Sequence, residues 1–550
     1  MSTKFFDASK VIADGFLQSI VFIDDEAYNK NQDGSNLYDL SPSEITKVFA
    51  KAHKICSVLN PVHESELFNL IKIGKKSDVV VLDWRMNLEP ESNSIINEED
   101  DAEIDDTRGP YTISIIKGIL TESFKVVPSL KLIIIYTGET NLREINERIF
   151  NELASVPALQ KGNFDISSQS FRIAVIGKSS LKNQVKHNRD IKERIKDYHE
   201  IPNFILDEFT KLTSGLVSNV ALKSITSLRE NTSKILHFFN KQLDPAFLTH
   251  RALLRIPDDA GELLKESILN SFKAIIDYER IEEMCSIKPI NNWIDSNTFT
   301  GTTLKVLGKH LKINQKELKL WQKKGYVASM EGILHSQFPR EVVEIEKIEK
   351  EYKSAKGDEV INHFTPSNEV PTSLNEKFSI LTNHKSNYLE PTYLPRLTLG
   401  TVIMGSISGD YLISIQQKCD STRIDVRESR RFLFLPLQIV SGNGHFNFLV
   451  KQNDTYVKLK VNFDTYGLKT IKFNATKDQM VVAKKGRNAK YLFYPIYYKA
   501  NKKSKKGIDQ SYEWIMDLKD GHSQKVANDY AAKLSRVAID ESEWLRRLNN

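Results

Sequence analysis

Four apolar runs in the first 180 residues are each followed directly by polar side chains. The runs are Ile20-Val21-Phe22-Ile23, Val79-Val80-Val81-Leu82, Leu132-Ile133-Ile134-Ile135-Tyr136 and Ile173-Ala174-Val175-Ile176-Gly177. The residues that follow or end them are Asp24, Asp25, Asp83, Thr137 and Lys178. Such runs predict strands that are buried on both faces of a parallel sheet, and open α/β sheets bind ligands at the carboxyl ends of their strands. We therefore expect these side chains to converge on one rim of the sheet.

The clustered carboxylates indicate a magnesium site. Mg²⁺ prefers oxygen ligands and keeps waters or phosphate oxygens in its remaining positions. We expect Asp24, Asp25 and Asp83 to be ligands. A further ligand is expected from the backbone carbonyl of Arg85, two residues after Asp83.

The same side chains suit phosphoryl transfer. A carboxylate beside the metal can act as a nucleophile toward a phosphoryl group and form an aspartyl phosphate. We assign Asp83 as this phosphoacceptor. Thr137 and Lys178 are predicted to hold the charged oxygens of the transferred group.

The order Asp-Asp, Asp, Thr, Lys at successive strand ends resembles the receiver domain of two-component response regulators. The run Asp83-Trp84-Arg85-Met86 is similar to the Asp-x-x-Met segment of that family, and the resemblance covers roughly residues 15–200. It implies a doubly wound, parallel five-stranded α/β sheet. It also implies Mg²⁺ as the cofactor and a sensor histidine kinase as the partner.

The sequence departs from the family pattern around the site. Receivers usually have Pro where this chain has Asn87 and Ser179, and many carry an aromatic switch residue where it has Val175. Two insertions, Asn29–Ser43 and Leu88–Pro110, lie beside the predicted site. Phosphoryl acceptance is therefore expected, but signalling through the usual hydroxyl-to-aromatic relay is not.

Length and composition limit the class of protein. At 550 residues we expect about three domains, on a prior of roughly 150 residues each. No run of 18 apolar residues predicts a membrane span, and the N-terminus lacks the apolar region of a signal peptide. The three cysteines show neither a disulfide framework nor metal-ligand spacing, which is typical of a cytoplasmic protein. The net charge of +6 permits contact with nucleic acid but does not indicate it.

Changes in composition along the chain predict its division into domains. We expect a receiver-like phosphoacceptor domain with an acidic insertion over residues 1–200 and a helical region over 201–360. A linker is expected over 361–395 and a β-rich domain, a small barrel or sandwich with a C-terminal helix, over 396–550.

Two motifs in the second half of the chain leave alternatives open. Leu304–Tyr326 has the outline of a helix-turn-helix, with one helix ending near Leu311 and a second, basic helix over Gln315–Lys324. Lys484-Lys485-Gly486-Arg487 and Lys499–Lys506 form a basic surface near several tyrosines. We favour solvated loops over a nucleic-acid groove there and do not expect nucleic acid as a partner.

Three functions remain open. In the first, the chain is a receiver that accepts a phosphoryl group without a catalytic output domain. In the second, it is a DNA-binding response regulator that uses residues 304–326. In the third, the receiver gates an enzyme in the C-terminal half. The third is disfavoured because no motif after residue 200 supplies a nucleophile, base and orienting group; Cys419 has no local histidine partner. We therefore expect no enzyme beyond a receiver that phosphorylates and dephosphorylates itself.

Long receivers followed by a large domain of uncharacterised chemistry resemble the receiver component of defensive two-component (Detocs-type) anti-phage systems of bacteria. That resemblance implies a phosphate sink in anti-phage defence, with a second receiver-containing effector protein as a further partner. The missing switch aromatic and the missing effector motif fit a sink better than a switch.

Overall fold

The chain forms two compact units in the computed structural model. One unit comprises residues 1–298 and 314–329, and the other comprises residues 299–313 and 330–550. The structure describes residues 3–28, 40–90, 109–125, 129–184, 189–299, 301–339, 346–347, 357–366, 373–385, 393–442, 444–452, 455–487, 490–496 and 510–535. Most of both insertions, including the acidic stretch 98–106, and the lysine-rich stretch 499–506 lie outside these residues. None of the described helices is both long and apolar enough to cross a membrane.

The first unit is built on a seven-stranded sheet with the order β2-β1-β3-β4-β7-β6-β5. Its strands are β1 (Ser19–Ile23), β2 (Ile55–Leu59), β3 (Val79–Leu82), β4 (Lys131–Thr137), β5 (Gln160–Lys161), β6 (Asp165–Ser167) and β7 (Phe171–Gly177). The first five in this order are parallel, which confirms the predicted doubly wound sheet. β6 and β5 extend the sheet beyond the prediction as an antiparallel edge.

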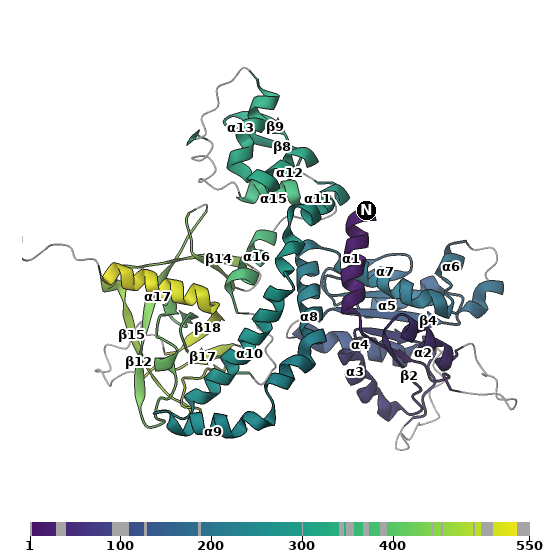
Figure 1. Cartoon of the computed structure of the whole chain (residues 1–550), viewed down its shortest axis with the longest axis horizontal. Helices are drawn as coiled ribbons and strands as arrows, with labels where there is room; N and C mark the ends of the chain where they lie inside the picture. The colour runs from purple at the N-terminus through teal and green to yellow at the C-terminus, as the bar shows by residue number, and fades with distance from the viewer. Residues whose placement is uncertain are drawn as a thin grey trace, which may run out of the picture. The chain divides into compact units, whose positions relative to one another are not determined.

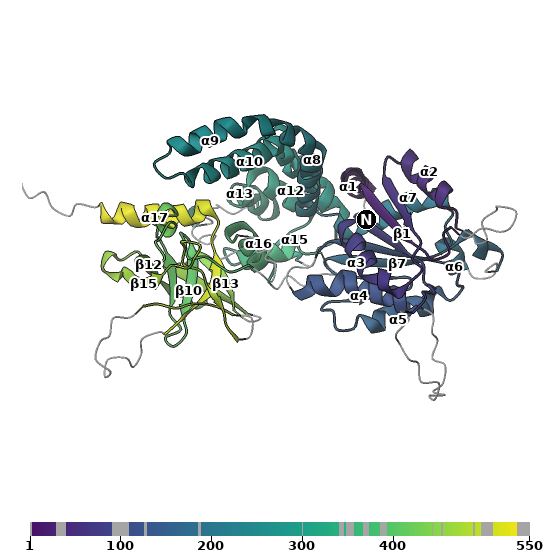
Figure 2. The same ribbon diagram turned by 90° about the horizontal axis from the view of Figure 1, so that it is seen from below.

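Helices cover both faces of this sheet (Figure 2). One face packs against α3 (Leu67–Lys76), α4 (Pro110–Lys125) and α5 (Leu142–Glu152). The other packs against α1 (Thr3–Phe16), α2 (Pro42–Lys51), α7 (Ile201–Thr213) and the start of α8 (Leu216–Phe238). Along β3, Val80 and Leu82 enter the first core, whereas Val79 and Val81 enter the second. A fully apolar strand is needed because both faces are buried.

The rest of the first unit is helical, as predicted. After the short helix α6 (Arg189–Arg194), α7 and α8 lead into α9 (Asp244–Leu253), α10 (Asp259–Tyr278), α11 (Ile287–Ser296) and α12 (Gln315–Lys324). α8 and α10 run side by side (Figure 1). α12 begins with a capping box at Asn314 and contacts α11 through the ion pair Lys319–Asp295 (2.5 Å).

The predicted first helix of a helix-turn-helix is wrong. Residues 303–312 form a β-hairpin of β8 (Thr303–Val306) and β9 (Lys309–Lys312) in the second unit. The turn residues Leu307 and Gly308 both have positive φ, +49° and +80°, which suits a two-residue hairpin turn. Leu304 and Val306 are buried while Lys305 between them is exposed, and this period of two belongs to a strand. The second helix of the motif is present as α12.

Besides the β8–β9 hairpin, the second unit contains a nine-stranded antiparallel sheet that curls into a half-barrel. Its nine strands are β10 (Thr401–Gly405), β11 (Tyr411–Ser414), β12 (Ser429–Ile439), β13 (Phe448–Gln452), β14 (Thr455–Val461), β15 (Lys469–Asn474), β16 (Lys484–Lys485), β17 (Tyr491–Phe493) and β18 (Tyr512–Asp517). Two apolar clusters line it, and α17 (Asp520–Leu534) adds Val526 and Tyr530 to one of them. Helix α13 (Tyr326–Gln337) begins in the first unit and ends in the second. The second unit also contains α15 (Gly357–Phe364) and α16 (Leu374–Asn383), the last within the range expected to be a linker.

Candidate functional site

The parallel strands deliver the expected residues to one rim of the sheet. β1 and β3 are neighbours with Ile23 opposite Leu82, so Asp24 and Asp83 leave adjacent strands at the same level. The backbone continues the ladder there, since Asp83 N donates to Ile23 O at 3.0 Å. On the other side of β3, Thr137 ends β4 opposite Gly177 of β7. Lys178 follows directly, and its N–H donates to Thr137 O at 2.7 Å.

Lys178 lies between two of the carboxylates. Its Nζ is 2.9 Å from Asp24 Oδ2 and 3.1 Å from Asp83 Oδ1. All three residues are at most 8 % exposed. Two buried carboxylates around one ammonium leave a net negative charge in a region of low dielectric, which favours the binding of a further cation.

Some of the remaining carboxylate oxygens accept hydrogen bonds and others do not. Backbone N–H groups of Glu26, Arg85 and Asn87 donate to Asp24 Oδ1 (2.9 Å), Asp83 Oδ2 (3.1 Å) and Asp25 Oδ2 (2.8 Å), respectively. Asp25 Oδ1 and Asp83 Oδ1 are buried without a hydrogen bond, although Asp83 Oδ1 retains its ion pair with Lys178. Buried oxygens without a donor are costly unless something else binds them.

Carboxylate oxygens without hydrogen bonds are available to bind the expected Mg²⁺. Within the described residues, no group of three or more His, Cys, Asp or Glu side chains is already arranged around a metal position. The donor set is nevertheless made of hard oxygen atoms, and two of them lack hydrogen bonds. On this chemistry the residues fit Mg²⁺.

Burial and charge shift the protonation of the site. Burial raises the pKa of Asp83 to about 7, and Lys178 only partly opposes this effect. Burial also raises the pKa of Asp25, against the hydrogen bond from Asn87. Burial alone would lower the pKa of Lys178, but Asp83 and Asp24 together raise it above its ordinary value. The two carboxylates thus keep Lys178 protonated, whereas burial opposes the charged form of Asp83 and a bound cation would favour it.

A hydroxyl that the sequence did not single out supports the turn after β3. Thr112 Oγ1, in the first turn of α4, donates to Asp83 O at 2.7 Å and contacts Trp84 O at 3.1 Å. Thr112 is fully buried. The only sequence signal for this role is a hydroxyl near the start of a helix that follows an insertion.

The ring of Trp84 packs against Gly109, near the end of the insertion that follows β3. Its side chain is 3 % exposed, and the insertion returns to the site at Gly109, which has a φ of +96°. A Cβ at Gly109 would lie 2.4 Å from the Trp84 ring, so glycine is required there by both conformation and space. The residue after Asp83 is thus fixed by the far end of the insertion.

The predicted site residues have different surroundings. Asp24, Asp83 and Lys178 are in direct contact. Thr137 is buried on the neighbouring strand, and its Oγ1 accepts from Glu139 N at 3.1 Å. At Arg85 the structure shows the backbone N–H bound to Asp83, whereas metal binding by its carbonyl stays a prediction.

The comparison with protein families agrees with this geometry. Residues 16–183, somewhat under a third of the chain, match the family described as the response receiver domain. The match spans all five side chains of the rim. No curated protein and no solved structure gives a significant match to the chain. Residues 16–183 are therefore a response receiver domain, which belongs to two-component phosphorelay signalling.

Proposed function

We propose that Asp83 is the phosphoacceptor of this receiver domain and that a histidine kinase is its phosphoryl donor. The observation that carries the proposal is the contact of Asp83 Oδ1 with Lys178 Nζ (3.1 Å) at a rim where Asp83 Oδ1 has no hydrogen bond. Asp83 Oδ1 attacks the phosphorus of a phosphohistidine, a P–O bond forms, and the P–N bond breaks with its electron pair going to the imidazole nitrogen. The product is an aspartyl phosphate on Asp83.

The neighbouring side chains have separate roles in this step. Lys178 is held as a cation by two carboxylates and pairs with a phosphoryl oxygen. Thr137, at the end of the next strand, donates its hydroxyl to another phosphoryl oxygen. The backbone N–H of Arg85 fixes the orientation of the Asp83 carboxylate through Oδ2, which leaves Oδ1 for the attack.

Mg²⁺ would be held by Asp24, Asp25 and Asp83 with the Arg85 carbonyl. When bound, it neutralises the charge that gathers on the phosphoryl oxygens. The unpaired Asp25 Oδ1 supports this assignment.

We further propose that the phosphorylated receiver acts as a phosphate sink, in the anti-phage role that the family resemblance implies. Val175 supports this proposal, since it stands where many receivers carry the switch aromatic and is fully buried in one core of the domain. A buried valine has neither the hydroxyl nor the ring that would swing toward Thr137. The phosphoryl group would then be stored or hydrolysed instead of being read out by that relay.

Intact-mass measurement after incubation with acetyl phosphate and Mg²⁺, or with a histidine kinase, tests the acceptor. The wild-type chain should gain a single phosphoryl adduct, and Asp83→Asn should gain none. Asp190→Asn is the matched control, because Asp190 is an exposed aspartate of the same unit that pairs with Arg143 away from the rim. An adduct that persists in Asp83→Asn, or no adduct from either donor, would contradict the proposal.

A further inference from the structure

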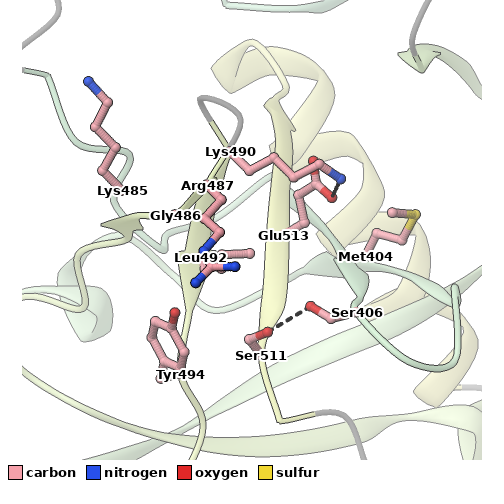
Figure 3. A pocket seen from close by; sticks show the side chains of 10 residues that line it. All are labelled: Met404, Ser406, Lys485, Gly486, Arg487, Lys490, Leu492, Tyr494, Ser511 and Glu513. Carbon is pink, nitrogen blue, oxygen red and sulfur yellow. Dashed lines mark hydrogen bonds and ion pairs between the residues drawn. The ribbon is translucent and has the colours of Figure 1, made fainter.

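An open groove on the second unit is built from four adjacent strands and the segments beside them (Figure 3). It has a volume of about 770 Å³. It is lined by Met404, Ser406, Lys485, Gly486, Arg487, Lys490, Leu492, Tyr494, Ser511 and Glu513. These residues come from β10, β16, β17 and β18 and from the segments that adjoin them. The receiver domain contributes no residue to this groove.

The floor of the groove is the surface of the sheet. Met404 and Leu492 both pair with Glu513 across neighbouring strands, so the three side chains form one row on one face. The next row holds two hydroxyls, since Ser406 Oγ and Ser511 Oγ are 2.7 Å apart. Tyr494 lies two residues beyond Leu492 on the same face, and it is 49 % exposed. The floor thus offers an exposed aromatic ring beside aliphatic and hydroxyl groups.

Cations surround this floor. Lys484 Nζ lies 5.7 Å from the centre of the Tyr494 ring, and Lys490 is paired with Glu513 at 2.7 Å. Neither Lys485 nor Arg487 forms an ion pair with any described residue. Figure 3 shows Arg487 on the same side of the groove as Leu492 and Tyr494. Arg487 therefore brings to the groove a positive charge that no carboxylate of a described residue neutralises.

The sequence around the groove is also positively charged. Residues 393–550 contain 27 Lys and Arg against 15 Asp and Glu, a net charge of +12, although the whole chain carries only +6. The first 392 residues are therefore net negative. The modest total conceals a strongly basic C-terminal region, and such a region attracts polyanions.

We propose that this groove binds single-stranded nucleic acid. Arg487 would contact phosphates, the Tyr494 ring would stack on a base, and the paired Ser406 and Ser511 hydroxyls would bind sugar or base edges. Exposed bases are required for stacking, which favours a single strand over a duplex. The proposal is independent of phosphoryl acceptance by Asp83.

Fluorescence anisotropy of labelled dT20 and rU20 with the full-length chain tests the proposal. Tyr494→Ala should weaken binding by about tenfold, because stacking contributes strongly for each base. Arg487→Glu should weaken binding and lower the slope of log affinity against log salt by about one. Tyr466→Ala and Lys477→Glu are the matched controls, an aromatic residue that is 90 % exposed and an exposed lysine of the same unit, neither lining the groove.

Heparin separates stacking from charge, because it is a polyanion without bases. Tyr494→Ala should leave heparin affinity unchanged while it weakens dT20 binding. The proposal is overturned if neither oligonucleotide binds, or if the groove variants bind them as tightly as the control variants. It is also overturned if vesicles with anionic lipid bind more tightly than dT20 and respond to the same variants, because the groove would then recognise a membrane surface.

Discussion

The hydroxyl of Thr112 shows how single residues determine the geometry of the acceptor. It holds the carbonyls of Asp83 and Trp84 at 2.7 and 3.1 Å from a fully buried position. Asp83 must leave β3 at a fixed angle if its carboxylate is to contact Lys178. Thr112 therefore acts on the acceptor through the backbone, as a positioning residue.

We expect Thr112→Val to lower the free energy of unfolding by about 1–3 kcal/mol, because it leaves buried carbonyls without a donor. It should also slow formation of the Asp83 adduct, because the turn that carries Asp83 loses its support. Thr112→Ser keeps the hydroxyl and should restore both properties. Urea denaturation and intact-mass kinetics measure the two effects; a Val variant as stable and as fast as wild type would show that the hydroxyl is dispensable.

The five rim residues could be predicted from the sequence because each directly follows or ends an apolar run. Thr112 and Gly109 could not, since the insertion Leu88–Pro110 separates their contacts with Asp83 and Trp84 along the sequence. Their roles depend on which residues the insertion brings back to Trp84, and spacing along the chain does not contain that information.

At the scale of elements, one buried ion-pair network ties α7 to β7. Glu208 of α7 is 1 % exposed and lies 2.5 Å from Arg172 Nε of β7 and 2.6 Å from Lys211 Nζ. Arg172 also pairs with Asp165 of β6 at 3.0 Å. Burial alone would raise the pKa of Glu208, but Arg172 and Lys211 together lower it below its ordinary value of 4.5.

The lowered pKa of Glu208 predicts a defined pH dependence. The stabilisation is fully present above about pH 4.5, the ordinary pKa, and is lost as pH falls through the lower pKa of the folded state. Glu208→Gln should lower the free energy of unfolding by about 3 kcal/mol at neutral pH, because it leaves the half-buried Arg172 with one carboxylate fewer. The difference in unfolding free energy between wild type and Glu208→Gln should shrink below pH 4.5. An equal difference at pH 3.5 and pH 7 would show that the network does not stabilise the fold through charge.

Element types could be predicted where the apolar period was clear. All five parallel strands and the helical region after residue 200 are present. The sequence predicts a helix at the β8–β9 hairpin because Leu304, Leu307 and Leu311 also fit a helical spacing. The turn at Leu307 depends on a positive φ, and a leucine in the sequence gives no signal for that conformation. β15, β16 and β18 lie outside the runs that the sequence predicts as strands, because the strands of this sheet are defined by pairing across long sequence separations.

At the scale of the whole molecule, the two units differ in the chemistry that they offer. The receiver unit contains the buried carboxylates and Lys178, whereas the C-terminal region carries a net charge of +12 and the groove around Tyr494. Net charge alone concealed this division, since the first 392 residues, with a net charge of −6, offset half of the +12 of the C-terminal region. Summed composition could therefore not predict the groove.

This division predicts that phosphoryl acceptance does not need the C-terminal half. Both apolar cores of the receiver unit lie within residues 13–222, and the five rim side chains lie within residues 24–178. A chain that ends at residue 299 should therefore form the same single adduct as the full chain, with Asp83→Asn in the short chain as the negative control. Circular dichroism and thermal unfolding establish that the short chain is folded. A folded short chain that accepts no phosphoryl group would show that the acceptor depends on residues beyond 299, and that the proposed phosphoacceptor domain of residues 1–200 is not independent.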